Sequence, residues 1–172
     1  MQFVTISSAI SLASVVLAAP LQTCLTPEEA SCIIEKYTGV LDGTGYDNKN
    51  ANVTAQALIA DDFTWDSDSF ASLQERPLDD GYATNKDLFM SELYEYGPWP
   101  NIHTNEVIVG CNKIAWYWTI PQADVGGYRV KGFILLEVNS QFQICKVYSE
   151  FNTIAWGLDR HLDIFCPTNP TY

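Results

Sequence analysis

Residues 106–154 read EVIVGCNKIAWYWTIPQADVGGYRVKGFILLEVNSQFQICKVYSEFNTI. Four stretches of this segment are rich in β-branched and aromatic residues, at 106–109, 113–120, 128–138 and 144–154. Turn-forming residues separate them, namely Gly110-Cys111-Asn112, Gly126-Gly127 and Asn139-Ser140-Gln141. Because short turns between β-rich runs favour antiparallel hairpins, this half of the chain predicts a mainly antiparallel sheet.

Helical signals precede the sheet. Thr26-Pro27-Glu28-Glu29 combines an N-cap, a first-turn proline and a capping-box Glu, and apolar residues follow at helical spacing as far as residue 41. We expect a second helix over 53–60 and a third from Thr84 or Asn85 to Gly97-Pro98, with a long loop over 67–82. The order predicts an α+β fold, a cone of about three N-terminal helices packed on a strongly curved, mainly antiparallel sheet.

The first 18 residues predict a secretory signal peptide. Residues 1–20 carry no charged side chain, and an apolar run leads to small residues at Ala18 and Ala19. This run is too short to span a bilayer, and no later stretch approaches the ~20 apolar residues that a span needs, so we expect no membrane partner. The remainder, 19–172, has the length of one domain, and the protein is expected to be extracellular.

The cysteines fit secretion. Five are present, at Cys24, Cys32, Cys111, Cys145 and Cys166. Disulfides persist in an oxidising compartment, but an odd number leaves one thiol over, and spacing does not fix the pairing. Our hypothesis pairs Cys24 with Cys111 and, second, Cys32 with Cys166. Asn52-Val53-Thr54 is a glycosylation sequon, so we also expect a glycoprotein.

Charge and missing motifs exclude several functions. The formal net charge is −12 with only nine Lys and Arg, which disfavours nucleic acid and anionic membranes. The sequence has no Gly-x-Ser-x-Gly elbow, His-Glu-x-x-His pair, Cys-x-x-Cys pair or glycine-rich phosphate loop. We therefore expect neither a cofactor nor a metal site.

The stretch Ala60-Asp61-Asp62-Phe63-Thr64-Trp65, together with the order of elements, resembles the nuclear transport factor 2-like superfamily. That superfamily includes SnoaL-like cyclases, scytalone dehydratase and ketosteroid isomerase. Residues 111–116 and 151–158 are similar to a secreted fungal branch of it. The resemblance implies a cone whose interior holds a small hydrophobic molecule, and it implies a homodimer through the outer face of the sheet.

The resemblance also suggests catalytic residues. Tyr37 lies where ketosteroid-isomerase-like proteins place the tyrosine that donates to a developing oxyanion, although a core tyrosine is the alternative. The position of their general base falls on Ser67, so the base does not carry over. Asp66 and Asp68 on either side of Ser67 are the candidate acids that remain there.

The last strand supplies a second candidate base. Side chains alternate along a strand, so Lys146, Tyr148, Glu150 and Asn152 share one face. If that face lines the cone, Glu150 is a general base whose pKa desolvation raises, Asn152 is its hydrogen-bond partner, and Tyr148 meets the ligand. If the face is solvated, Glu150 pairs with a lysine instead.

Other residues are candidate ligand contacts. Trp65, Trp116 and Trp118 form either an aromatic wall for a flat ligand or ordinary core packing. Glu137 is either the last residue of a buried strand face or a solvent-exposed residue at the end of its strand. His103, in an expected loop ahead of the sheet, matters if that loop folds over the mouth of the cone.

Two functions remain open. The first is a cofactor-free isomerase, cyclase or dehydratase of a small hydrophobic metabolite, in which a carboxylate moves a proton and Tyr37 or Asn152 steadies an oxyanion. The second is a non-catalytic secreted protein that binds a small ligand or a host or cell-wall partner.

Overall fold

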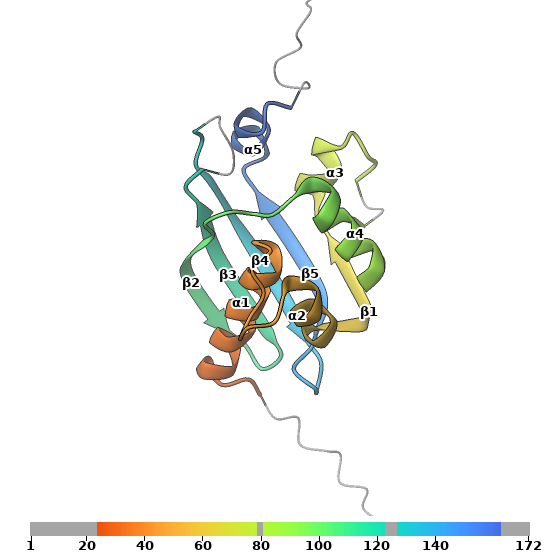
Figure 1. Ribbon diagram of the computed structural model, residues 1–172, viewed down its shortest axis with the longest axis vertical. Helices are drawn as coiled ribbons and strands as arrows, with labels where there is room; N and C mark the ends of the chain where they lie inside the picture. Colours follow the sequence, from red (N-terminus) through yellow and green to blue (C-terminus); the bar gives the residue numbers. More distant parts are fainter. Residues whose placement is uncertain (1–23, 79–80, 123–126, 163–172) are drawn as a thin grey trace, which may run out of the picture.

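The computed structural model describes residues 24–78, 81–122 and 127–162, in which helices cover one face of a curved sheet (Figure 1). The expected signal peptide and Cys166 lie outside the described residues. In chain order the elements are α1 (Pro27–Leu41), α2 (Ala51–Leu58), β1 (Ile59–Asp66), α3 (Asp68–Leu73), α4 (Lys86–Tyr96), β2 (His103–Val109), β3 (Lys113–Ile120), β4 (Val130–Val138), β5 (Ile144–Phe151) and α5 (Thr153–Asp159).

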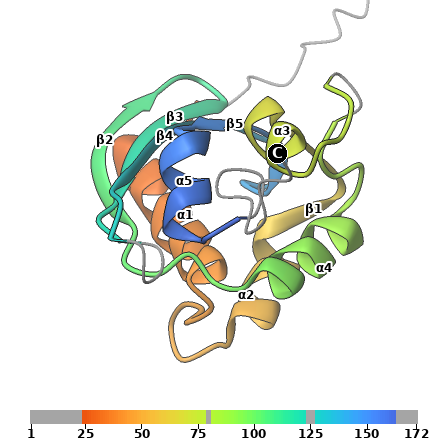
Figure 2. The same ribbon diagram turned by 90° about the horizontal axis from the view of Figure 1, so that it is seen from above.

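The sheet is mixed rather than purely antiparallel. Its strand order is β1-β5-β4-β3-β2, in which β2 to β5 pair antiparallel and β1 joins β5 in parallel. The hairpins expected from 106–154 are therefore confirmed. Seen from above, the sheet curves around α1 and α5, and α2 and α4 lie along the open side (Figure 2). The α+β class and the curved sheet are confirmed.

The expectation of three helices ahead of the sheet is wrong, because four precede β2 and a fifth follows β5. The helices expected near 26–41, 53–60 and 84–96 are α1, α2 and α4. The predicted loop over 67–82 contains α3, and the predicted strand over 144–154 ends at Phe151, where α5 takes over. Both missed helices are six or seven residues long, too short for a periodic apolar pattern to reveal.

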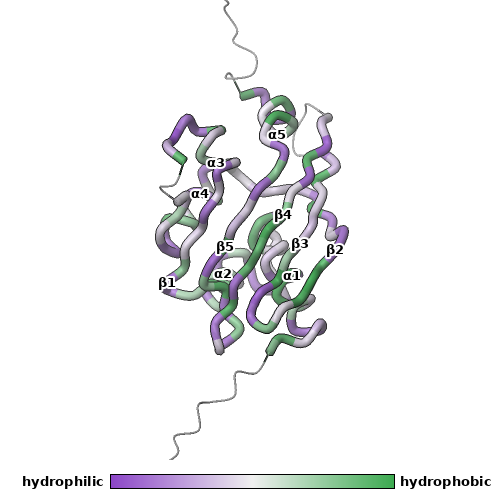
Figure 3. Tube along the Cα trace, turned by 180° about the vertical axis from the view of Figure 1, so that it is seen from behind, coloured by the Kyte–Doolittle hydropathy of each residue, from purple (hydrophilic) through white to green (hydrophobic). Residues whose placement is uncertain are grey.

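Alternation along the strands divides the sheet into an inner and an outer face. On β3 the buried apolar side chains are Ile114, Trp116, Trp118 and Ile120. Residues of differing hydropathy follow one another along the strands (Figure 3). Trp118 pairs with Gly132 on β4, which in turn pairs with Phe151 on β5. Gly132 leaves room for the Trp118 indole, since a Cβ there would lie 2.5 Å from Trp118 Cζ2.

One disulfide joins the start of the domain to the sheet. Cys24 bonds Cys111 in the β2–β3 turn, and the Leu25 N–H donates to the Cys111 carbonyl at 2.9 Å. The first disulfide hypothesis is therefore confirmed. Cys32 is a free thiol in the structure, which does not support its pairing with Cys166. Within the described residues, none of the helices is long and apolar enough to cross a bilayer.

Replacing Gly132 with Ala is expected to lower the free energy of unfolding by about 1–3 kcal/mol, because the new methyl overlaps Trp118 and the Glu150 carbonyl. Gly110→Ala is the matched control, since a Cβ there would meet the Lys113 carbonyl oxygen at an ordinary 3.5 Å. Urea unfolding of both variants measures the difference. Equal losses in the two would contradict this packing of the cone.

Candidate functional site

Aromatic side chains fill the interior of the cone. One cluster runs from ring to ring with centroid separations of 4.7–6.4 Å and consists of Trp65, Phe70, Tyr82, Trp99, Trp118, Phe151 and Trp156. It joins the sheet to α3, α5 and the segment after α4. A void of about 10 Å³ remains beside Trp65 and Tyr82. Such a void holds about one water at most, so among the described residues the rings leave no room for a ligand beside Trp65 and Tyr82.

A larger cavity lies where the aromatic cluster reaches the open end of the cone, between α3, α4 and α5. Its volume is about 340 Å³, within the usual range of small-molecule pockets. Phe70, Leu73, Trp156 and Leu162 supply apolar walls, and Gln74, Glu95 and Arg160 supply polar groups. We call it the mouth cavity.

A polar network borders this end. The Tyr82 hydroxyl donates to Glu92 Oε2 at 2.9 Å and accepts from Gln74 Nε2 at 2.8 Å. Glu92 also lines the small void beside Trp65. Hydrogen bonds to both neighbours fix the Tyr82 hydroxyl, so the network holds α3 and α4 at a defined spacing.

Two arginines lie over the aromatic rings of the same end. The Arg160 guanidinium lies 5.1 Å from the Trp156 ring and donates to the Pro98 carbonyl at 3.1 Å. Arg76 lies 5.3 Å from the Tyr82 ring. Cation–π contacts of this kind orient the two rings, of which Trp156 lines the mouth cavity.

Tyr37 is fully buried between Phe89 and Trp116, as the core alternative expected. Burial raises the pKa of its hydroxyl, which therefore stays protonated at any physiological pH. Neither this hydroxyl nor Trp118 Nε1 has a hydrogen-bond partner among the described residues. Asp159 is the one buried acid in the described part of the chain, and it accepts from the Tyr128 N–H at 2.7 Å.

Glu150 does not face the interior. Val147 and Ser149 are the buried neighbours on β5, and Glu150 is exposed on the opposite face. Its carboxylate accepts from the Asp68 N–H at 3.0 Å, the Ser69 N–H at 3.1 Å and the Ser69 hydroxyl. Glu150 thus satisfies the first amides of α3, a structural role at a helix N-terminus.

Asn152 is not a partner of Glu150 either. Its Oδ1 accepts from the Ala155 N–H at 3.0 Å, so it is the N-cap of α5. Asp68 is exposed in the first turn of α3, and Asp66 is half-buried where β1 pairs with Tyr148. The proposed acid, its partner and the two aspartates therefore do not converge on Tyr37.

The remaining candidates divide between the core and the outer surface. Trp65 donates to Ser149 Oγ at 2.7 Å, and Trp116 donates to Thr104 Oγ1 at 3.0 Å, so both indoles are anchored within the core. The outer face carries Glu137, paired with Lys113 at 2.7 Å, and Tyr148, whose ring lies 4.5 Å from Lys146 Nζ. His103 is exposed and begins β2 rather than lying in a loop.

Sequence reasoning missed most of the mouth cavity. Its residues come from α3 and α5, which were expected as a loop and a strand, and from Glu95 on α4. One signal was available: Ser67 and Asn152 are both N-cap residues that precede apolar segments. No group of three or more His, Cys, Asp or Glu side chains in the described ranges is arranged to hold a metal ion.

Comparison with known proteins identifies the fold. Residues 23–162 match the family model described as the NTF2-like domain. A "putative ketosteroid isomerase" from Kribbella flavida is 17% identical over 73% of this chain and 78% of that chain, with a TM-score of 0.53. A SnoaL-like protein of unknown function from Burkholderia thailandensis is 11% identical over 74% and 98%, with a TM-score of 0.56. No curated protein matches the chain in sequence. At these identities the structural likeness shows the fold alone.

Replacing Glu150 with Ala is expected to speed amide exchange at Asp68 and Ser69 about tenfold, because both N–H groups lose a charged acceptor. Hydrogen exchange followed by NMR measures this. Glu106→Ala, which removes an exposed carboxylate on β2, is the control and should leave both amides unchanged. Unchanged exchange in Glu150→Ala would show that this carboxylate does not hold α3.

Proposed function

The chain belongs to the NTF2-like domain family, and from the geometry of its open end we propose that it binds a small hydrophobic molecule in the mouth cavity without transforming it. The observation that carries the proposal is the cavity of about 340 Å³ walled by Phe70, Leu73, Trp156 and Leu162. A flat apolar ligand would extend the aromatic cluster that already fills the cone. Gln74 and Arg160 would fix its orientation.

Binding is favoured over acid–base chemistry because none of the acids that the sequence suggested lines the mouth cavity, whose described wall contains one carboxylate, that of Glu95. A general base has to lie within hydrogen-bond reach of the proton it removes. Glu150 and Asn152 anchor helices, and the buried Asp159 is held by a backbone N–H. Glu92, beside the aromatic cluster, already accepts from Tyr82.

Secretion and membership of the secreted fungal branch are part of the proposal. The confirmed Cys24–Cys111 bridge supports it, because disulfides persist in oxidising compartments. The sequon residue Asn52 is exposed near the start of α2, where a glycan would be accommodated. A mature N-terminus at Ala19 in N-terminal sequencing of the exported protein would support this part, and a retained Met1 would oppose it.

The homodimer that the resemblance implies stays a prediction. The outer face of the sheet exposes Ile108 at 62% and Phe133 at 61%, and Phe133 stacks on Tyr117 with centroids 4.6 Å apart. A second copy of this chain packed on the same face would cover these rings.

Leu73→Arg is expected to weaken the binding of Nile red, a flat uncharged dye, by about tenfold or more, because a charged side chain enters the apolar wall of the mouth cavity. Dye fluorescence measures the affinity, and the thermal midpoint confirms folding. Leu78→Arg makes the same change at an exposed residue of the same segment and should bind as the wild type does. Equal affinities in a folded Leu73→Arg protein would rule out the mouth cavity as the site.

A further inference from the structure

A second cavity lies at the opposite end of the sheet from α5, between α1, α2 and the β4–β5 turn (Figure 1). Its volume is about 350 Å³, and the residues that matter here are Lys36, Lys49, Tyr46, Ala57, Leu58 and Phe142. We propose that this basic cavity binds a small organic carboxylate, with the two ammonium groups on the anion and the apolar residues around the hydrocarbon body. It is separate from the mouth cavity and shares no lining residue with it.

The backbone places Tyr46 and Lys49 side by side. The two residues exchange N–H···O hydrogen bonds of 3.1 and 3.0 Å across a two-residue turn. Asp47 and Asn48 in that turn both have positive φ, 51° and 60°, as the tight hairpin turns of type I′ require. Residues directly opposite in such a pair project on the same side, so the tyrosine ring and the ammonium stem are adjacent.

The turn is held firmly against α1. The Gly45 N–H donates to the Gly39 carbonyl at 2.7 Å, and a Cβ on Gly39 would lie 2.1 Å from the Gly45 oxygen, so this approach requires glycine. On the other side, Thr54 Oγ1 on α2 accepts from the Tyr46 N–H at 3.1 Å. The basic wall is therefore formed before any ligand arrives, which lowers the entropic cost of binding.

The charges of this wall are available to a ligand. In the described part of the chain the ion pairs join Lys86 to Asp61 and Lys113 to Glu137, so neither lysine of the cavity is neutralised by one. Lys36 Nζ lies 5.7 Å from the Tyr46 ring centroid. Two of only nine basic residues thus converge on one cavity of a strongly acidic protein.

The neighbouring titratable groups leave Tyr46 as a donor. A hydrogen bond with Cys32, whose Sγ lies 4.0 Å from the hydroxyl, raises the pKa of Tyr46, and the charges of Glu35 and Asp47 add to this. Both acids are exposed and lie outside the cavity lining. A protonated tyrosine beside two ammonium groups favours an anion with several acceptor atoms.

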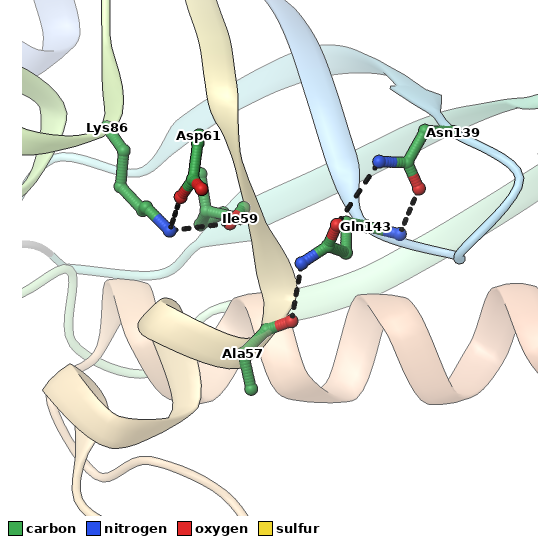
Figure 4. Close-up of polar contacts among 6 residues, drawn as sticks. All are labelled: Ala57, Ile59, Asp61, Lys86, Asn139 and Gln143. Atoms are coloured by element: carbon green, nitrogen blue, oxygen red, sulfur yellow. Dashed lines mark hydrogen bonds and ion pairs between the residues drawn. The ribbon is translucent and has the colours of Figure 1, made fainter.

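Phe142 contributes an apolar side chain to the wall of the basic cavity, and its backbone has a positive φ. Its φ is +59°, a left-handed conformation that bulky residues rarely adopt, and its side chain is still 38% exposed. The turn that carries it is fixed by Asn139, which binds Gln143, and by Gln143 Nε2, which donates to the Ala57 carbonyl at 3.4 Å (Figure 4). The left-handed conformation belongs to the β4–β5 turn and places the half-exposed Phe142 ring in the wall of the cavity.

Isothermal titration calorimetry with octanoate and with octanol tests the charge requirement. Octanoate is expected to bind about tenfold or more tightly than octanol, and Lys36→Met/Lys49→Met should remove that advantage. Lys131→Met, at an exposed lysine on β4, is the matched control and should bind octanoate as the wild type does. Equal binding of the acid and the alcohol, or an unaffected double variant, overturns the proposal.

Phe142→Gly separates binding from stability. Because glycine adopts positive φ without strain, the thermal midpoint should stay the same or rise while octanoate affinity falls. NMR shifts locate the ligand and should appear at Tyr46, Lys49 and Gln141. If Leu73→Arg, rather than the lysine variant, abolishes octanoate binding, the acid binds in the mouth cavity. That result would overturn this inference and leave the first proposed function intact.

Discussion

The rest of the structure depends on the packing of Trp118 over Gly132. Three neighbouring strands place Trp118, Gly132 and Phe151 in one row, and the absence of a side chain at Gly132 lets the indole lie against β4. Trp118 then contacts Trp99, which in turn contacts Trp156 of α5. The inner face of the sheet thus fixes the position of the last helix and of the segment that leaves α4.

This packing moves the candidate binding site outward. In an empty cone the ligand would lie against Tyr37, Trp65 and Trp116, but here those rings contact other core rings or donate to the hydroxyls of Ser149 and Thr104. A cavity of about 340 Å³ lies instead at the open end, where α3 and α5 meet over Phe70 and Trp156. The aromatic residues of the interior therefore form the base of the mouth cavity and do not themselves enclose a ligand.

Local patterns predicted the fold well and the site poorly. The capping box of α1 and the period of β3 were readable because their causes lie within a few residues. The Cys24–Cys111 pairing was a hypothesis that the spacing did not fix, because the two cysteines are 87 residues apart. The alternation of Lys146, Tyr148 and Glu150 on β5 was read correctly, whereas Asn152 lies beyond the strand as the N-cap of α5. Alternation says which residues share a face and not which face is buried. That choice depends on packing with distant elements, and it decided whether Glu150 was a base or a helix anchor.

The two cavities differ in a way that follows from how their walls are built. The mouth cavity is formed by α3 and α5, short helices that depend on Glu150, Asn152 and the aromatic cluster for their stability. Such elements open at low free-energy cost, which lets bulky apolar ligands enter. The basic cavity is formed by the Tyr46–Lys49 turn, which packs closely on α1, and by the β4–β5 turn, which is hydrogen-bonded to α2. Hydrogen bonds fix both turns. Charge recognition requires fixed donors, because an ammonium group that must first be ordered loses much of its electrostatic gain to entropy. The mouth cavity, with apolar walls on short helices, therefore suits a hydrophobic molecule, and the basic cavity, whose backbone is held by hydrogen bonds, suits a small anion.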